Sequence, residues 1–235
     1  MATEVKQTEQ QAAPVQKTAE DRFANSFEGF WNKNGKKLSA VILVVALLVG
    51  GYFAYNKFVK GPENEKAGNA MWKAEENFRN DSFALALNGD GSAANQGFLK
   101  VINKYGGTKT GNLAKFYAGA CYLQLGDFNN AVKYLNDFST TSDAVNVRAY
   151  GLLGDAYSEL GKKNEAIDSY RKASSVFPDD AANSAEYLFR AALLSSDLGK
   201  TKEAITMLQE LKAKFPLTQR GYEADKYLAK LGETK

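Results

Sequence analysis

Three copies of one short pattern constrain this sequence more than any other feature does. A Leu-Gly pair occurs at Gly126, Gly161 and Gly199, and an alanine follows each glycine after five residues. The first two glycines are 35 residues apart, and the last two are 38 apart. Self-similarity with a period of about 20–50 residues is typical of repeat proteins, in which each unit buries its apolar face against the next. The sequence therefore predicts a stack of repeated units.

The residue types within each copy predict a pair of antiparallel helices. Glycine ends a helix cheaply, because it adopts the left-handed backbone conformation that follows many helix C-termini. Gly119, Gly154 and Ala192 precede the turns and are small enough for two helices to approach closely. Pro178 and Pro216 cannot continue a helix, so they mark the end of the second helix. We therefore predict an all-α fold, an α-solenoid built from antiparallel helix pairs.

This pattern resembles the tetratricopeptide repeat (TPR), and residues 147–180 carry it most fully. That segment has Leu153, Gly154, Tyr157, Gly161, Ala166, Tyr170, Ala173 and Pro178 in register. We predict tetratricopeptide repeats at 112–146, 147–184 and 185–218, with a degenerate repeat containing a loop insertion at 64–111 before them and a capping helix at 219–235 after them. The resemblance implies a module that binds other proteins.

The degenerate repeat is expected to contain two helices separated by an insertion. The first helix would carry Ala70, Trp72, Ala74 and Phe78, and the second Phe98, Val101, Ile102 and Tyr105. Between them, residues 80–93 include an Asn-Gly-Asp-Gly-Ser segment that resembles part of a calcium-binding loop. Position six of such a loop would be Ala93 rather than glycine, and position twelve would be Leu99 rather than glutamate. We therefore expect a plain polar loop here.

Residues 38–55 form an uncharged apolar run, LSAVILVVALLVGGYFAY. As a helix this run covers roughly 27 Å, close to the thickness of the hydrocarbon core of a bilayer. We predict a transmembrane helix over 38–58 rather than a cleaved signal peptide, because a long tail precedes the run. Ala46, Gly50 and Ala54 recur every fourth residue, a spacing that allows a partner helix to pack closely. Alanine and glycine are also common in membrane spans that have no such partner.

The orientation of the span follows from charge and length. Four basic residues lie on each side of the span, but Lys36 and Lys37 adjoin it directly. A short tail is also more easily kept in the cytoplasm than the roughly 175 residues that follow the span. We therefore predict a cytoplasmic N-terminus and a translocated repeat domain.

The tail before the span has two parts. Residues 1–20 contain few large apolar groups and are predicted to be a disordered cytoplasmic tail. Residues 21–37 are predicted to form an amphipathic interfacial helix, because four aromatic side chains recur on one helical face. These are Phe23, Phe27, Phe30 and Trp31. Such a helix either lies on membrane lipid or docks to a membrane partner, or it simply extends and anchors the span.

The composition excludes several classes of function. The chain has no histidine and one cysteine, Cys121, which removes histidine-based nucleophile pairs, most catalytic zinc sites and any disulfide within the chain. Its net charge of +3, without a clustered basic face, does not indicate nucleic-acid binding. We therefore expect no catalytic residue, no metal, no cofactor, no nucleic acid and no small-molecule substrate, and we predict that the protein is not an enzyme.

A repeat array of this kind is expected to bind its partner in a groove lined by the first helix of each repeat. By position within the repeat, the groove would be lined by Leu113, Phe116, Ala120, Leu123, Arg148, Asp155, Glu186, Phe189 and Leu193. Tetratricopeptide domains that bind the acidic C-termini of cytosolic chaperones have mainly lysine, asparagine and arginine there, so an apolar or amphipathic segment fits this sequence better. Alternatively, Phe116 and Phe189 only pack against neighbouring helices.

A closer resemblance rests on the order of the segments and on one junction. A short tail, an aromatic helix ending in FWNKNGKKL at residues 30–38, one span and a repeat array follow one another. This order is similar to the YfgM family, ancillary subunits of the bacterial SecYEG translocon that have a comparable Asn-Gly-Lys junction. The resemblance implies a single-pass protein of the bacterial inner membrane with its array in the periplasm. It also implies association with the Sec translocon and with a membrane-anchored periplasmic chaperone of the peptidyl-prolyl isomerase type.

A second hypothesis remains open from the sequence. This array is more regular than is usual in the YfgM family, and its Phe-Pro repeat ends at Pro178 and Pro216 also resemble periplasmic arrays of outer-membrane assembly lipoproteins and of the cell-division coordinator family. The protein would then be a tethered periplasmic scaffold for envelope assembly or cell division. Those families lack an uncleaved span of this kind, which favours the adaptor in protein translocation.

Overall fold

The computed structural model describes the backbone of residues 19–233 and the side chains of Glu28 and of residues 30–233. Helices make up nearly all the regular structure of this part of the chain, and no strand occurs within residues 19–233. The predicted all-α class is confirmed. The chain divides into two compact units, one ending at Phe58 and the other beginning at Val59.

The first unit is built on one long helix, α1 (Ala19–Tyr55), which a short π-helical turn, η1 (Asn56–Lys60), follows. Helix α1 runs from the predicted interfacial segment into the predicted span without a break in its helical backbone. The prediction of disorder for residues 1–20 is wrong at Ala19 and Glu20, because alanine and glutamate are good helix formers and extend α1 by one half-turn. Residues 1–18 lie outside the described part of the chain.

The apolar run of α1 is exposed from Ser39 to Tyr55. Of the part of the chain that the structure describes, one helix is long and apolar enough to cross a membrane, and none of its apolar window is buried within the protein. A core helix of a soluble fold would be mostly buried. The exposure of side chains such as Leu47 and Leu48 is therefore consistent with a single-pass membrane anchor.

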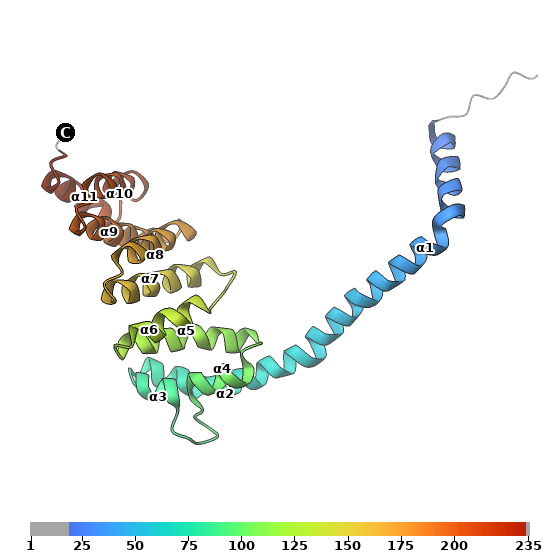
Figure 1. Cartoon of the computed structure of the whole chain (residues 1–235), viewed down its shortest axis with the longest axis horizontal. Helices are drawn as coiled ribbons and strands as arrows, with labels where there is room; N and C mark the ends of the chain where they lie inside the picture. Colours follow the sequence, from blue (N-terminus) through green and yellow to red (C-terminus); the bar gives the residue numbers. More distant parts are fainter. Residues whose placement is uncertain (1–18, 234–235) are drawn as a thin grey trace, which may run out of the picture. The chain divides into compact units, whose positions relative to one another are not determined.

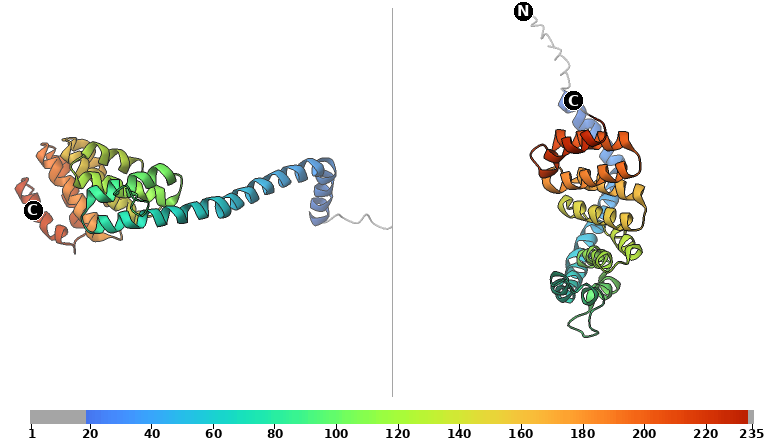
Figure 2. Two further views of the ribbon diagram at one scale, coloured as in Figure 1. Left: turned by 90° about the horizontal axis from the view of Figure 1, so that it is seen from below. Right: turned by 90° about the vertical axis from the view of Figure 1, so that its left-hand side faces the viewer.

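The second unit is a stack of helices that follow one another in chain order (Figure 1). They are α2 (Gly61–Arg79), α3 (Phe83–Asn88), α4 (Gly97–Tyr105), α5 (Lys109–Gln124), α6 (Phe128–Asn136), α7 (Asp143–Glu159), α8 (Lys163–Val176), α9 (Ala181–Asp197), α10 (Thr201–Lys214) and α11 (Gln219–Lys230). Helices α5, α7 and α9 are the first helices of three repeats, and α6, α8 and α10 are their second helices. Figure 2 shows the stacking from two further directions.

The turns between paired helices have the predicted geometry. Gly126, Gly161 and Gly199 have φ angles of 79°, 70° and 74°, which is the left-handed region that favours glycine. In each turn the next backbone N–H donates to a carbonyl five residues earlier, as from Lys162 to Tyr157 at 2.9 Å. This is the hydrogen bond of a Schellman motif, and it ends the first helix at a fixed point.

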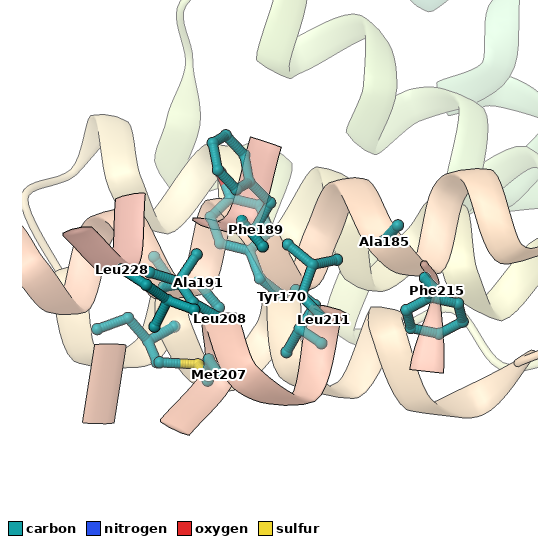
Figure 3. Close-up of a cluster of buried hydrophobic side chains, with 14 residues drawn as sticks. Tyr170, Ala185, Phe189, Ala191, Met207, Leu208, Leu211, Phe215 and Leu228 are labelled. Carbon is teal, nitrogen blue, oxygen red and sulfur yellow. The ribbon is translucent and has the colours of Figure 1, made fainter. Parts of the chain in front are cut away.

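The small residues before these turns permit the predicted close contact. A Cβ added to Gly119 would lie 2.6 Å from Cγ of Leu135 in α6, and one added to Gly154 would overlap the ring of Tyr170 in α8. The two helices of these repeats are therefore so close that no side chain larger than the hydrogen of glycine fits at Gly119 or Gly154. The C-terminal core that results joins side chains of α8, α9, α10 and α11, including Tyr170, Leu208 and Leu211 (Figure 3).

The degenerate repeat contains the same turn, with an aspartate in place of the glycine. Asp81 has a φ of 55°, and the N–H of Ser82 donates to the carbonyl of Asn77 at 2.9 Å. Asp81 therefore holds the position of the turn glycine. Ala74 lies seven residues before it and Ala86 five residues after it, the spacing that the other three repeats share. Helix α2 is thus the first helix of this repeat, and α3 begins its second helix.

The prediction of a plain polar loop over residues 80–93 is therefore wrong. Helix α3 lies inside this segment and buries Ala86 and Leu87. The second helix then stops at Gly89 and resumes as α4 at Gly97, and these two glycines are in direct backbone contact, because a Cβ on Gly97 would overlap backbone atoms of residues 87–89. The chain leaves the helix and returns to it at nearly the same point.

The interruption is eight residues long, and it preserves the register of the helix. In α10 the buried residues Ala204, Leu208, Leu211 and Phe215 lie 5, 9, 12 and 16 residues after Gly199. In the degenerate repeat the buried Ala86, Phe98, Val101 and Tyr105 lie 5, 17, 20 and 24 residues after Asp81. Subtracting eight from the last three gives the same spacing. Helices α3 and α4 are therefore one second helix with residues 90–97 inserted.

Helix α11 has the pattern of a further first helix. Gly232 has a φ of 83°, and the N–H of Glu233 donates to the carbonyl of Leu228 at 3.0 Å, as in the other turns. Seven residues before Gly232 stands Asp225, where the repeats have glycine or alanine, and its carboxylate pairs with Lys212 at 2.7 Å. A carboxylate at the point of closest helix contact gives α11 a polar outer face, which suits the predicted capping role.

Deleting residues 90–97 should leave the array folded. The deletion joins Gly89 to Phe98 with the buried face in register. It loses the 3.3 Å hydrogen bond from Asn77 to Asn95, so we expect the Tm to change by no more than about 4 °C in thermal denaturation followed by circular dichroism.

The matched control deletes only residues 90–95. Two extra residues then remain in the helix and turn the buried face of α4 by about 200°. Exposure of Phe98 and Val101 should lower the Tm by roughly 10 °C. If the two deletions destabilise the protein equally, residues 90–97 are not an insertion that preserves the register of the helix.

Candidate protein-binding groove

A groove of about 600 Å³ crosses the first helices of the repeat unit. Its lining comes from α2, α5, α7 and α9 and from the turn and start of α3. The residues are Glu75, Phe78, Arg79, Asp81, Phe83, Phe116, Tyr117, Ala120, Gln124, Arg148, Leu152, Asn183 and Tyr187. Because consecutive first helices lie side by side in such an array, one continuous surface collects residues from four repeats.

One part of the groove is an aromatic cluster. The ring of Tyr117 stacks on Phe98 at 5.2 Å between centroids and meets Phe78 edge-on, also at 5.2 Å. Phe83 lies edge-on to Phe78 at 5.5 Å, and Phe116 packs against Tyr117 at 5.5 Å. Burial raises the pKa of the Tyr117 phenol, so its hydroxyl is a neutral donor. Rings held by one another offer a rigid apolar surface.

The other part of the groove is polar and positively charged. Arg148 on α7 is exposed, and it takes part in no ion pair among the described residues. Tyr187 of α9 lies against Gly151, where any side chain would overlap its ring. Burial raises the pKa of Tyr187, so its hydroxyl also stays protonated. A guanidinium and a neutral phenol therefore stand at this end of the groove.

Beyond the groove, charged side chains of α7, α9 and α11 pair with one another. Arg190 donates to Asp155 and to Glu186, both at 2.8 Å, and Arg220 donates to Glu186 and to Glu223, both at 2.7 Å. The phenol of Tyr170 donates to Asp155 at 2.7 Å. Burial alone would raise the pKa of Glu186, but the hydrogen bonds from Arg220 and Arg190 outweigh it and hold that pKa below its usual value. This chain of ion pairs fastens α7, α8, α9 and α11 together.

The structure places the predicted groove residues in different surroundings. Phe116, Ala120 and Arg148 line the groove. Leu113 lines a smaller pocket beside Phe138, and Leu193 packs against the C-terminal core. Leu123 is half-buried. A binding role for any of them stays a prediction.

Three of the predicted groove residues are already engaged inside the array. Asp155 and Glu186 belong to the ion-pair chain. Phe189 is 3% exposed and belongs to the core, so placing it in the groove is wrong. Its ring lies 4.9 Å from that of Tyr227, and the guanidinium of Arg220 sits 4.5 Å above it. The physical reason is that α11 covers this part of α9.

The sequence predicts one of the four aromatic residues that line this end of the groove, Phe116, and misses Phe78, Phe83 and Tyr117. Phe78 was assigned to a helix but not to the groove, and Phe83 was assigned to a polar loop. Both follow once Asp81 is recognised as the turn residue, because the five-residue step to Ala86 then identifies the helix that carries Phe83. Tyr117 and Tyr187 had no such signal, since their exposure depends on which neighbouring helices cover them.

The predicted membrane residues are partly described. Phe30 and Trp31 are 52% and 42% exposed, and Trp31 lies against Gly35, which is buried. The side chains of Phe23 and Phe27 lie outside the described residues. Ala46, Gly50 and Ala54 are exposed, and a Cβ added to Gly50 would meet no atom within 4 Å. Within the described part of the chain, no group of three or more acidic residues and cysteines could hold a metal ion.

Comparison with known proteins gives three family matches. A family described as a tetratricopeptide repeat-like domain matches residues 28–150, which is 123 of the 235 residues. Two tetratricopeptide repeat families match residues 147–180 and 186–218. No curated protein matches the sequence. Such repeats are generally non-catalytic and bind other proteins, so the array is a protein-interaction adaptor.

Neutralising Glu186 should destabilise the C-terminal repeats in a pH-dependent way. Its folded pKa is lowered from 4.5, so its ion pairs stabilise the fold above that pH and lose their effect as the pH falls through the folded pKa. We expect Glu186→Gln to cost about 1 kcal/mol at pH 7, or roughly 2–4 °C in Tm. The difference from wild type should shrink below pH 4.5.

The matched control is Glu159→Gln, which changes an exposed glutamate of α7 outside the ion-pair chain. Its Tm should follow that of wild type at every pH. A Glu186→Gln deficit that is the same at pH 3.5 as at pH 7 would show that the ion pairs do not stabilise the repeats.

Proposed function

Because the chain belongs to the tetratricopeptide repeat-like domain family, we propose that it is a membrane-anchored adaptor of protein translocation. In this role it is an ancillary subunit of the bacterial Sec translocon and links SecYEG to a membrane-anchored periplasmic chaperone. One observation carries the proposal: a fully exposed apolar helix and a protein-binding array occur in one chain. The similarity of residues 30–38 to the YfgM junction supports the choice of the translocon.

The two parts of the chain have different tasks in this proposal. Helix α1 holds the complex in the membrane, where Ala46, Gly50 and Ala54 form a face that a partner helix can approach closely. Phe30 and Trp31 lie at the headgroup level and anchor the start of the span. The groove of the repeat unit binds the chaperone or an emerging chain through apolar contacts. The proposal therefore predicts separable losses when one part is changed.

In the proposed membrane orientation, the N-terminus lies in the cytoplasm and the array lies in the periplasm. Lys36 and Lys37 adjoin the span on its N-terminal side and are more easily kept in the cytoplasm. The single native thiol makes this orientation simple to test. Cys121 is buried, and burial raises its pKa to about 12, so it resists maleimides, which react with thiolates.

Cysteines placed on either side of the span should react differently in intact cells. Ser92→Cys, in the exposed insertion, should react with a membrane-impermeant maleimide once the outer membrane is permeabilised. Glu28→Cys should react only after the inner membrane is lysed, and the wild-type protein should stay unlabelled throughout. If Glu28→Cys is labelled before Ser92→Cys, the N-terminus lies in the periplasm and the proposed orientation is wrong.

Enlarging the small-residue face should release the translocon partner. Ala46→Leu, Gly50→Leu and Ala54→Leu together keep the span apolar but block close helix packing. We expect this variant to insert in the membrane and to lose most of the SecYEG that co-purifies with wild type in mild detergent, measured by quantitative mass spectrometry.

The matched control changes the opposite face, with Val44→Leu, Leu48→Ile and Tyr52→Phe. It should retain the translocon subunits at the wild-type level. Recovery of envelope-assembly or division proteins that persists in both variants would favour the alternative, a tethered scaffold that uses the span only as an anchor.

A further inference from the structure

The groove divides into an aromatic end and a polar end. Phe78, Phe83, Phe116 and Tyr117 form the aromatic end, from α2, α3 and α5. Arg148, Leu152, Asn183 and Tyr187 form the polar end, from α7 and α9. At about 600 Å³ the groove is within the range of pockets that hold a small ligand, so it accommodates a few side chains of one segment and not a folded surface.

Some charged side chains around the groove are already paired within the protein, and others are free to interact with a ligand. Asp155, Arg190, Glu186, Arg220 and Glu223 are engaged in their own chain of ion pairs, which contains three carboxylates and two guanidinium groups. At the aromatic end Arg79 lies 3.9 Å from Glu75, and Asp81 sits in the exposed turn at the rim. Arg148 at the polar end and Asp81 at the aromatic end are exposed, and neither makes an ion pair among the described residues, so Arg148 is the cation of the groove that is available to a ligand.

The hydrogen-bonding groups near Arg148 select for an acceptor. Burial is the main cause that raises the pKa of Tyr117 and of Tyr187 and keeps both phenols protonated as donors. The carboxylates of Glu75 and Asp155 act in the same direction, and the charge of Arg148 opposes them. No hydrogen bond involving either hydroxyl occurs within residues 30–233. A guanidinium and two neutral phenols that line one groove complement a carboxylate, and a cation beside Arg148 would be repelled.

We propose that the groove binds a partner-protein segment in which an aspartate or glutamate lies close to an aromatic or large aliphatic side chain. The carboxylate pairs with Arg148, and the apolar side chain packs on the ring cluster around Phe116. This inference rests on the proposed adaptor function and names the chemistry of its ligand. It makes Arg148 the determinant of charge specificity and Phe116 a source of affinity.

The test is a selection of random dodecapeptides on the full-length protein in detergent micelles. Wild type should enrich peptides that carry Asp or Glu within about four residues of an aromatic or large aliphatic residue. Arg148→Glu should reverse the preference and enrich Lys or Arg at the same spacing. Phe116→Ala should weaken binding of the wild-type consensus peptide about tenfold.

The matched control is Arg171→Glu, which makes the same charge change at an exposed arginine of α8 outside the groove. It should select the same peptides as wild type. Because Arg148 makes no ion pair, both variants should keep the wild-type Tm, and reversed selectivity cannot arise from unfolding.

Three outcomes would overturn the inference. If the enriched peptides lack acidic residues, the ligand does not require a carboxylate. If Arg148→Glu selects the same peptides as wild type, Arg148 does not determine the specificity. If light scattering shows that the wild-type protein is a dimer and that Arg148→Glu is a monomer, the groove binds a second copy of the chain. The span variants test the adaptor function independently: loss of SecYEG there with a failed peptide selection would leave the function standing and reject this ligand.

Discussion

The fold depends on a contact that two consecutive repeats make, between a glycine of the first helix and a large side chain of the second. Gly154 admits the ring of Tyr170 because it has no side chain of its own, and Gly119 admits Leu135 in the same way. At this separation the two helices share one core, and the chain must reverse within a few residues. The left-handed residue of the turn, Gly161 in the most regular repeat, follows from that requirement.

The same principle acts between repeats and shapes the groove. Gly151 leaves room on α7 for Tyr187 of the next first helix, whose hydroxyl end packs against this glycine while the residue lines the groove. In the N-terminal repeats, Tyr117 stacks on Phe98 of the interrupted second helix. The ring of Tyr117, which lines the groove, thus packs against the core on its other side. Apolar contact in the groove therefore costs little side-chain entropy.

Sequence patterns predicted the repeats because their determinants are local: a glycine, an alanine five residues later and a small residue seven earlier. The same spacing exists in the first repeat, but Asp81 replaces the glycine and eight inserted residues displace Phe98 and Tyr105 from their expected positions. The sequence still predicted a degenerate repeat with a loop insertion at 64–111, but not the turn at Asp81 or the helix that follows it, although the packing is the same. Phe189 was misplaced for a different reason, since its burial depends on α11, a helix that lies about thirty residues further along the chain.

Charge is the property that position within the repeat predicts least. Asp155, Glu186 and Arg148 all occupy first-helix positions, and their residue types alone suggest three comparable recognition groups. In the folded array two of them are consumed by Arg190 and Arg220, which come from the next repeat and from the capping helix. A carboxylate whose pKa two guanidinium groups hold down has little left to offer a ligand. Among the described residues, Arg148 and Asp81 are the charged groups of the groove that folding leaves without an ion pair, and only the assembled array reveals this.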